Sequence, residues 1–167
     1  MRDARIAQIY EGTNGVQAMD LVGRKLAKDG GRGVRAFFDL VASDIAEARA
    51  AGDPAGVAGP LEKALGDLQG STMWLAQNGM ADPNNAGAGA YAYMQLMGLV
   101  SLGWMWLKMA VVAQRLISQG GEDANYLEAK LATARFFAAR ELVAASALRS
   151  KVEAGAVSVM ALPVEAF

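Results

Sequence analysis

The chain contains one long segment, Ala86–Leu107, in which no residue carries a charge. Its length is sufficient for a helix that crosses a bilayer, with Trp and Tyr side chains as interfacial anchors. However, alanine, glycine, Gln95 and Ser101 dilute the segment, and such small residues let helices approach closely in either solvent. A helix that is apolar on all sides also occurs at the centre of a bundle. We therefore predict a helix that is buried or faces a second subunit, with membrane contact as the alternative.

Aspartate and proline mark where further helices begin. Asp53-Pro54 and Asp82-Pro83 each combine an N-cap residue with proline at the first helical position. They predict one helix over residues 54–78 and a second, containing the uncharged segment, over residues 83–118. Asp123 is expected to begin the last helix.

Apolar side chains recur at helical spacing in three of the expected helices. The three sets are Val34, Phe37, Phe38, Val41, Ile45 and Ala48; Val57, Leu61, Leu65, Leu68, Thr72 and Leu75; and Leu127, Leu131, Ala134, Ala138, Leu142, Ala145 and Leu148. We find no convincing strand alternation, so the sequence predicts an all-α chain, an up-down antiparallel bundle of about four long helices. The tail from Val159 to Phe167, interrupted by Pro163, is expected to lie extended against this bundle.

The first seventeen residues carry an ordered run of specific side chains. It reads Arg2-Asp3-Ala4-Arg5-Ile6, then Ile9-Tyr10-Glu11-Gly12-Thr13-Asn14, and then Gln17. This run closely resembles the segment that carries the catalytic base in acyl-CoA dehydrogenases, flavoenzymes that oxidise acyl-CoA thioesters to 2-enoyl-CoA. In that family a helix ends in R-D-A-R/K-I, the loop I-Y-E-G-T follows, and a second helix opens with Gln.

The resemblance implies that the chain is the C-terminal fragment of such an enzyme, because in the family this segment lies near the end of a chain more than twice as long. Residues 1–28 would be the end of the catalytic helical domain, a helix–loop–helix appendage that carries the catalytic-base loop. Residues 29–33 are rich in glycine and are expected to be the linker between the two domains. Residues 34–167 would form an appended C-terminal helical bundle.

By this resemblance Glu11 is the base that removes the α-proton of the substrate, and FAD accepts the β-hydride. Burial raises the pKa of a carboxylate toward the working pH, which suits this task. Gly12 would let the backbone approach the thioester without a side chain in the way. Thr13 and Asn14 are expected to cap a helix from about Gly15 to Lys28. In the family the residues at positions 13–15 approach the FAD, whose pyrophosphate suits a helix N-terminus; Asn14-Gly15 replaces the more common Ser-Gln.

The fragment alone is expected to be inactive and to bind no FAD, because most of the elements that hold the cofactor and the acyl chain are absent. Glu11 would then be solvated, with no cause for a raised pKa. In the full-length enzyme, the resemblance implies acyl-CoA as substrate and an electron-transferring flavoprotein that reoxidises the flavin. The alternative is a free-standing helical module that forms a homo-oligomer through its apolar helix, or attaches to a membrane through Ala86–Leu107.

The composition excludes several other classes of function. Without cysteine there are no disulfides and no thiolate chemistry, and without histidine there are no Ser-His or Cys-His pairs and no usual zinc ligands. We therefore predict no metal site. A formal net charge of −1 gives no reason to expect a nucleic-acid partner. The charged N-terminus lacks the apolar region of a signal peptide, and a cytoplasmic location is expected.

Two clusters have both a functional and a structural interpretation. The first is the basic set Arg24, Lys25, Lys28, Arg32 and Arg35, which could meet CoA phosphates or anionic lipid. The second is the set Met94, Met97, Met105 and Met109, which could line an adaptable acyl pocket. We predict the structural role for both, a solvated helix face for the basic set and core filling for the methionines.

Overall fold

The computed structural model describes residues 5–6, 9, 12–120 and 123–166, and the regular structure within them is entirely helical. The main helices are α1 (Thr13–Asp20), α2 (Arg32–Ala50), α3 (Ala58–Ala81), α4 (Pro83–Ser118), α5 (Ala124–Phe136) and α6 (Ala145–Glu153). The short ones are π-helices at Leu21–Lys25 and Phe137–Glu141 and 3₁₀-helices at Leu142–Ala144 and Val164–Ala166. The prediction of an all-α chain is confirmed.

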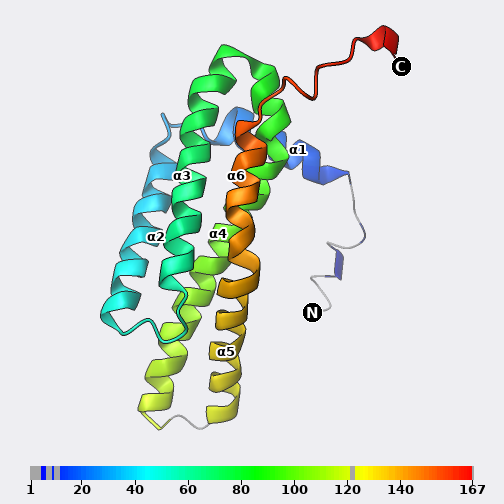
Figure 1. The fold of residues 1–167 in the computed structure, drawn as a ribbon. Helices are drawn as coiled ribbons and strands as arrows, with labels where there is room; N and C mark the ends of the chain where they lie inside the picture. Colours follow the sequence, from blue (N-terminus) through cyan, green and yellow to red (C-terminus); the bar gives the residue numbers. More distant parts are fainter. Residues whose placement is uncertain (1–4, 7–8, 10–11, 121–122, 167) are drawn as a thin grey trace.

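Four long helical rods, namely α2, α3, α4 and the continuous α5–α6, form an antiparallel bundle (Figure 1). Helices α2 and α3 run side by side, α4 passes behind α3 and α6, and α5 continues into α6 as the fourth rod. Helix α4 is the central element, because it packs against α1, α2, α3, α5 and α6. The predicted up-down bundle is therefore confirmed, and the N-terminal helix α1 is docked on its α4 side.

Two of the predicted helix starts are correct. The Asp82 side chain accepts a hydrogen bond from the backbone N–H of Asn84, with Pro83 in the first turn of α4. The Asp123 side chain accepts one from the N–H of Tyr126 at the start of α5. In both cases a carboxylate satisfies an N–H group that the helix itself leaves unpaired.

The predicted helix start at Pro54 is wrong, because α3 begins only at Ala58. Asp53 has a φ of 42°, in the left-handed region, and the chain makes a turn before the helix. The Asp53 carboxylate reaches across this turn and accepts hydrogen bonds from the N–H groups of Val57 at 3.0 Å and Ala58 at 3.2 Å. Asp53 therefore caps the N-terminus of α3, although it lies further from the helix along the chain than an ordinary N-cap residue does.

The three predicted apolar faces meet in one hydrophobic core. Most of their residues are buried, and the half-buried ones are Val34, Phe37, Thr72, Leu127 and Leu148. Helix α4 adds Tyr93, Leu96, Val100 and Leu107 to this core. Since periodicity of 3.6 residues reports the side of a helix that packs, the sequence pattern identified the inward faces correctly.

Helix α4 is buried on one side only. Tyr93 and Leu107 face the core, whereas Tyr91 and Leu102 on the other side are exposed. By length and composition α4 could cross a membrane, although a core helix of a bundle meets the same criterion. The prediction of a buried helix is therefore correct for one face of α4.

The methionines of α4 divide between these two sides. Met94 and Met97 are half-buried, and Met97 packs against the core. Met105 and Met109 are exposed. The prediction that all four fill the core is wrong for these last two, because their positions on α4 fall on the side that no described helix covers.

The fourth rod is irregular where α5 passes into α6. A π-helix at Phe137–Glu141 is followed directly by a 3₁₀-helix at Leu142–Ala144. The first has a wider turn than the α-helix and the second a tighter one. The inward positions Ala138, Leu142 and Ala145 all remain buried through the change.

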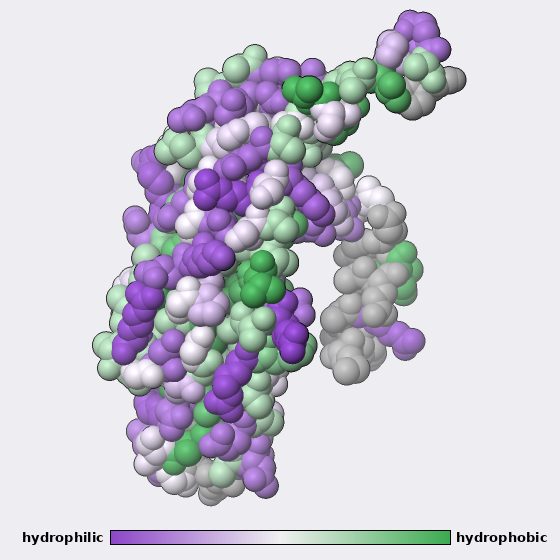
Figure 2. All heavy atoms as spheres, in the orientation of Figure 1, coloured by the Kyte–Doolittle hydropathy of each residue, from purple (hydrophilic) through white to green (hydrophobic). Residues whose placement is uncertain are grey.

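The tail after α6 leaves the bundle. Gly155 turns the chain with a φ of 64°, and the Asn85 side chain accepts a hydrogen bond from the N–H of Ala156 at 2.9 Å. Beyond this point the tail projects outward (Figure 1) with its apolar side chains exposed (Figure 2). The prediction that the tail lies against the bundle is therefore wrong for residues 159–166, because Gly155 and Asn85 direct the chain away from it.

Tyr93 gives the bundle a testable dependence on alkaline pH. Its hydroxyl lies 2.8 Å from Oγ1 of Thr72, which uses its single proton on the carbonyl of Leu68, so Tyr93 donates. Burial raises the pKa of Tyr93 to about 12. An unfolded tyrosine titrates at about pH 10. The buried, protonated Tyr93 therefore contributes its full stabilisation of the folded state below that pH, and this contribution is lost as the pH rises toward 12.

We expect Tyr93→Phe to lower the free energy of unfolding by about 1 kcal/mol at neutral pH, the usual value of one hydrogen bond. Between pH 10 and 12 the wild-type protein should lose up to about 3 kcal/mol that the variant does not lose. Urea unfolding at several pH values measures both effects. Tyr126→Phe, at an exposed tyrosine, is the matched control and should behave as the wild type.

Candidate functional site

The candidate site lies at the start of α1. Gly12 occupies the N-cap position with a φ of 94°, and no side chain caps the helix. Thr13, Asn14 and Gly15 form the first turn of α1 and are exposed. Glu11, the predicted base, lies outside the described residues, so its role stays a prediction, as do the roles of the other predicted site residues.

The structure corrects the predicted capping of this helix. Thr13 and Asn14 were expected to precede the helix, but α1 begins at Thr13. A φ of 94° is easily adopted by glycine and strained for residues with a Cβ, so the turn falls at Gly12. A Cβ at Gly12 would meet no atom within 4 Å. The positive φ, and not a lack of space, is therefore what favours glycine at this position.

The C-terminal end of this helical segment carries a small ion-pair cluster. Arg24 donates to Asp20 at 2.9 Å, and the ammonium of Lys25 lies 3.2 Å from the same carboxylate. Hydrogen bonds from Arg24 first, and then from Lys25, lower the pKa of Asp20 to about 2. Arg24 and Lys25 are more than half exposed, as expected for a solvated helix face.

The outer side of α1 is open. Ala18 is buried against the bundle, whereas Val16 and Met19 are exposed. The following π-helix provides the anchor, because Leu21 and Val22 pack against the core. The first turn of α1 therefore lies at the surface, and the segment that follows α1 is packed against the core.

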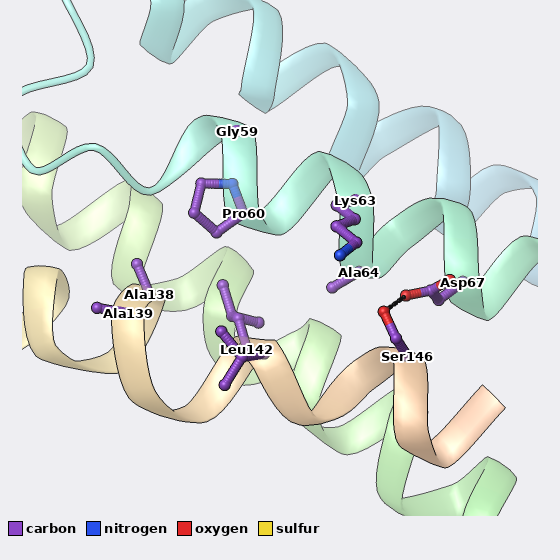
Figure 3. Close-up of a pocket in the computed structure, with 10 residues that line it drawn as sticks. Gly59, Pro60, Lys63, Ala64, Asp67, Ala138, Ala139, Leu142 and Ser146 are labelled. Atoms are coloured by element: carbon purple, nitrogen blue, oxygen red, sulfur yellow. Dashed lines mark hydrogen bonds between the residues drawn. The ribbon is translucent and has the colours of Figure 1, made fainter. Parts of the chain in front are cut away.

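A second candidate is a groove of about 410 Å³ between α3 and the irregular joint of α5 and α6 (Figure 3). Pro60 and Leu142 line its apolar part, and Lys63 is a further lining residue. At its polar end Ser146 donates a hydrogen bond to Asp67 at 2.8 Å. Because Arg149 also lies 3.5 Å from the Asp67 carboxylate, we interpret the Ser146–Asp67 contact as a structural link between α3 and α6.

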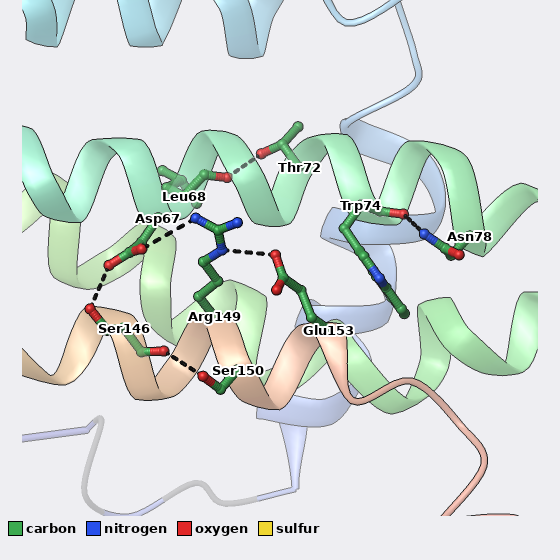
Figure 4. Close-up of polar contacts among 9 residues, drawn as sticks. All are labelled: Asp67, Leu68, Thr72, Trp74, Asn78, Ser146, Arg149, Ser150 and Glu153. Atoms are coloured by element: carbon green, nitrogen blue, oxygen red, sulfur yellow. Dashed lines mark hydrogen bonds and ion pairs between the residues drawn. The ribbon is translucent and has the colours of Figure 1, made fainter.

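The same carboxylate belongs to a polar cluster that joins α3 to α6 (Figure 4). Arg149 lies 3.5 Å from Asp67 and donates to Glu153 at 2.8 Å. The guanidinium fits because the facing residue is Gly70, where a Cβ would lie 2.7 Å from Cζ of Arg149. This cluster was not predicted from the sequence, although the spacing of Arg149 and Glu153 by one helical turn was an available signal.

Among residues 5–6, 9, 12–120 and 123–166, no group of three Asp, Glu, His or Cys side chains could hold a metal ion.

Comparison with known proteins identifies the helical bundle. Residues 37–163 match the family model described as "Acetyl-CoA dehydrogenase C-terminal like". The chain belongs to this family. The resemblance to acyl-CoA dehydrogenases, first noted on residues 2–17, is therefore supported independently by the bundle.

Curated relatives of this acyl-CoA dehydrogenase C-terminal region cover nearly the whole chain. A 3-methylmercaptopropionyl-CoA dehydrogenase of Ruegeria pomeroyi is 40% identical over 90% of the chain. A broad-specificity linear acyl-CoA dehydrogenase, FadE5, of Mycobacterium tuberculosis is 29% identical over 100% of it, and a butyryl-CoA dehydrogenase of Syntrophomonas wolfei is 25% identical over 99%. The chain spans 26–29% of the length of these relatives.

The family match covers only the helical bundle, whereas an alignment with a relative also covers the N-terminal segment. The family match begins at residue 37 and so falls within the predicted bundle, residues 34–167. The alignment with the mycobacterial relative covers the entire chain and therefore includes the segment around Glu11. The division into residues 1–28, 29–33 and 34–167 stays a prediction.

Proposed function

We propose that this chain is the C-terminal part of an FAD-dependent acyl-CoA dehydrogenase, which converts acyl-CoA to 2-enoyl-CoA. The observation that carries the proposal is 40% identity over 90% of the chain with a relative named as a dehydrogenase of a CoA thioester. The ordered run from Arg2 to Gln17 adds the residues that the chemistry requires.

In this proposal the carboxylate of Glu11 takes the proton from the carbon next to the thioester carbonyl. The electrons of that C–H bond form the new double bond, and the β-hydrogen leaves with its bonding pair. The acceptor for this hydride would be supplied by FAD, which residues 13–15 would help to hold. Gly12 keeps the backbone beside the base free of a side chain, where the thioester must come close.

The start of α1 fits an anionic cofactor. Gly12 supplies no capping side chain and the first turn carries no acidic residue, so within the described part of the chain no side chain caps the first N–H groups of α1. Such groups, together with the positive end of the helix dipole, favour a pyrophosphate. Thr13, Asn14 and Gly15 would hold this part of the FAD.

The proposed enzyme needs more than these 167 residues, because the relatives are about three and a half times as long. The isolated chain should therefore neither bind FAD nor oxidise acyl-CoA. In the full-length protein an electron-transferring flavoprotein would reoxidise the flavin, and we place the enzyme in the cytoplasm.

The test begins with the genomic DNA upstream of the codon for Met1. An open frame that continues for several hundred codons should encode a protein with bound flavin, whose visible absorbance is bleached by an acyl-CoA. The 167-residue chain, purified in parallel, should show no flavin absorbance. A stop codon and ribosome-binding site directly before Met1 would instead make the chain free-standing and refute its role as part of this enzyme.

A further inference from the structure

The groove between α3 and the joint of α5 and α6 has the size and lining of a small-molecule site. Its volume of about 410 Å³ lies within the range of about 300–1,000 Å³ that is usual for such sites. Ala64, Ala138 and Leu142 are buried at its floor, whereas the lining residues Pro60 and Val143 are exposed. The groove is therefore a concave apolar surface that a ligand can reach from solvent.

The irregular joint forms one wall of this groove. Ala138 and Ala139 belong to the π-helix, and Leu142 and Val143 belong to the 3₁₀-helix. The rod of residues 124–153 contains no glycine or proline that would disturb a helix locally. Single π-turns within α-helices occur frequently at functional sites. The position of the irregularity in the groove wall therefore points to binding at this place.

Two of the described lining residues carry a charge, and the protein compensates one of them. Asp67 accepts a hydrogen bond from Ser146 at 2.8 Å and lies 3.5 Å from Arg149 (Figure 4). In the part of the chain that the structure describes, none of the ion pairs includes Lys63. The groove thus combines apolar walls with one positive charge that is open to a ligand.

We propose that this groove binds a monocarboxylate with an apolar body, of the kind that a medium-chain fatty acid anion represents. The carboxylate pairs with the ammonium of Lys63, and the alkyl chain lies along Ala64, Ala138 and Leu142 (Figure 3). The lining residues 59–67 extend about 12 Å along α3, a length that suits a chain of this class.

The two charged residues also define which ligands the groove disfavours. Asp67 follows Lys63 by four residues, about 6 Å along α3, so its negative charge opposes a second negative charge on the ligand. Phosphate and other dianions are disfavoured for this reason. A cationic ligand would meet Lys63, and the ammonium contributes nothing to binding of an uncharged alkyl chain. A single carboxylate is the head group that fits both side chains.

This binding site does not depend on the proposed enzyme function. The groove lies between α3 and the α5–α6 rod, whereas α1, which carries the candidate catalytic segment, packs against α4. Glu11 and residues 12–15 take no part in it. A failure of either proposal therefore leaves the other standing.

Titration of the 167-residue chain with octanoate tests the site. Calorimetry should show saturable binding of one octanoate per chain, with a Kd of about 1 mM or lower. Amide NMR signals should shift within residues 59–67 and 138–146, and inorganic phosphate should not compete. The absence of saturable binding, shifts confined to the exposed side of α4 or to the tail, or competition by phosphate would each overturn the proposal.

Two variants separate the charge from the apolar surface. Lys63→Met removes the charge and should weaken octanoate binding about 5-fold, the upper value for an exposed ion pair, but should bind 1-octanol as the wild type does. Ala139→Phe, at an exposed position, fills the groove and should prevent binding of both ligands while the helical circular dichroism is retained.

Lys151→Met is the matched control for Lys63→Met. It removes the charge of an exposed lysine on α6 that does not line the groove, and should bind octanoate as the wild type does. Equal affinity of the wild type and Lys63→Met for octanoate would refute carboxylate recognition by Lys63. Undiminished binding by Ala139→Phe would place the ligand outside the groove and refute the site itself.

Discussion

Replacing Glu11 by glutamine in the full-length enzyme should lower kcat for acyl-CoA oxidation by about 10²–10⁴-fold, the range that a general base contributes. Glutamine has nearly the size of glutamate, but its amide cannot take up the α-proton. The rate of flavin reduction after mixing with acyl-CoA under anaerobic conditions measures the effect, because hydride transfer requires the loss of this proton. Substrate binding should change far less than the rate.

Asp20→Asn is the matched control for Glu11→Gln. It removes a carboxylate from the same segment, but Asp20 is bound to Arg24 and Lys25 at the far end of α1. Because its pKa lies at about 2, Asp20 is ionised throughout any practical assay and cannot act as a base that titrates near neutrality. Its loss should leave kcat nearly unchanged. A Glu11→Gln enzyme with full activity would show that the base is elsewhere and would exclude Glu11 from the mechanism.

The bundle could be predicted from sequence because its helices carry their inward faces at a single period. Phe38, Val41, Ile45 and Ala48 recur on one side of α2, and all four are buried. Asp82-Pro83 fixed the start of α4 for a similar local reason, since an N-cap carboxylate and a proline act within one turn. Such features need no knowledge of distant contacts.

The departures depend on contacts or backbone angles that no local pattern records. The sequence of the α5–α6 rod, residues 124–153, contains no glycine or proline, yet a π-helix and a 3₁₀-helix interrupt it. Asp53 matched an N-cap signal, but its positive φ inserts a turn before α3. The tail was expected to lie against the bundle, but Gly155 directs it outward.

For the candidate site, the run of residues 2–17 predicted which residues matter, and the structure added a backbone reason for glycine at position 12. Gly12 was expected for close approach of the thioester, and its φ of 94° is a separate requirement for glycine. The capping of α1 by Thr13 and Asn14 failed because the turn falls one residue earlier.

Gly103→Leu should lower the free energy of unfolding by about 3 kcal/mol, the upper part of the range for overpacked cores. Gly103 is buried in α4 where three elements meet: a Cβ there would lie 2.8 Å from Cδ2 of Leu142 and 3.1 Å from Cδ1 of Leu61. A full leucine side chain cannot be accepted without displacement of both. The loss exceeds the gain of about 1 kcal/mol that leucine brings over glycine in a helix. Chemical denaturation gives the difference directly.

Gly66→Leu isolates the packing effect from the helix effect. Gly66 lies in α3 with open space at its Cβ, so this variant should be more stable by about 0.5–1 kcal/mol. Leu142→Ala alone should cost about 3 kcal/mol through the cavity it leaves. Combined with Gly103→Leu it should cost less than the sum, by about 1–2 kcal/mol, because the new side chain fills that cavity. If the losses of free energy in the two single variants simply add in the double variant, Gly103 and Leu142 do not share one packing site. The close approach of α4 to the irregular joint would then not be the reason for glycine at position 103.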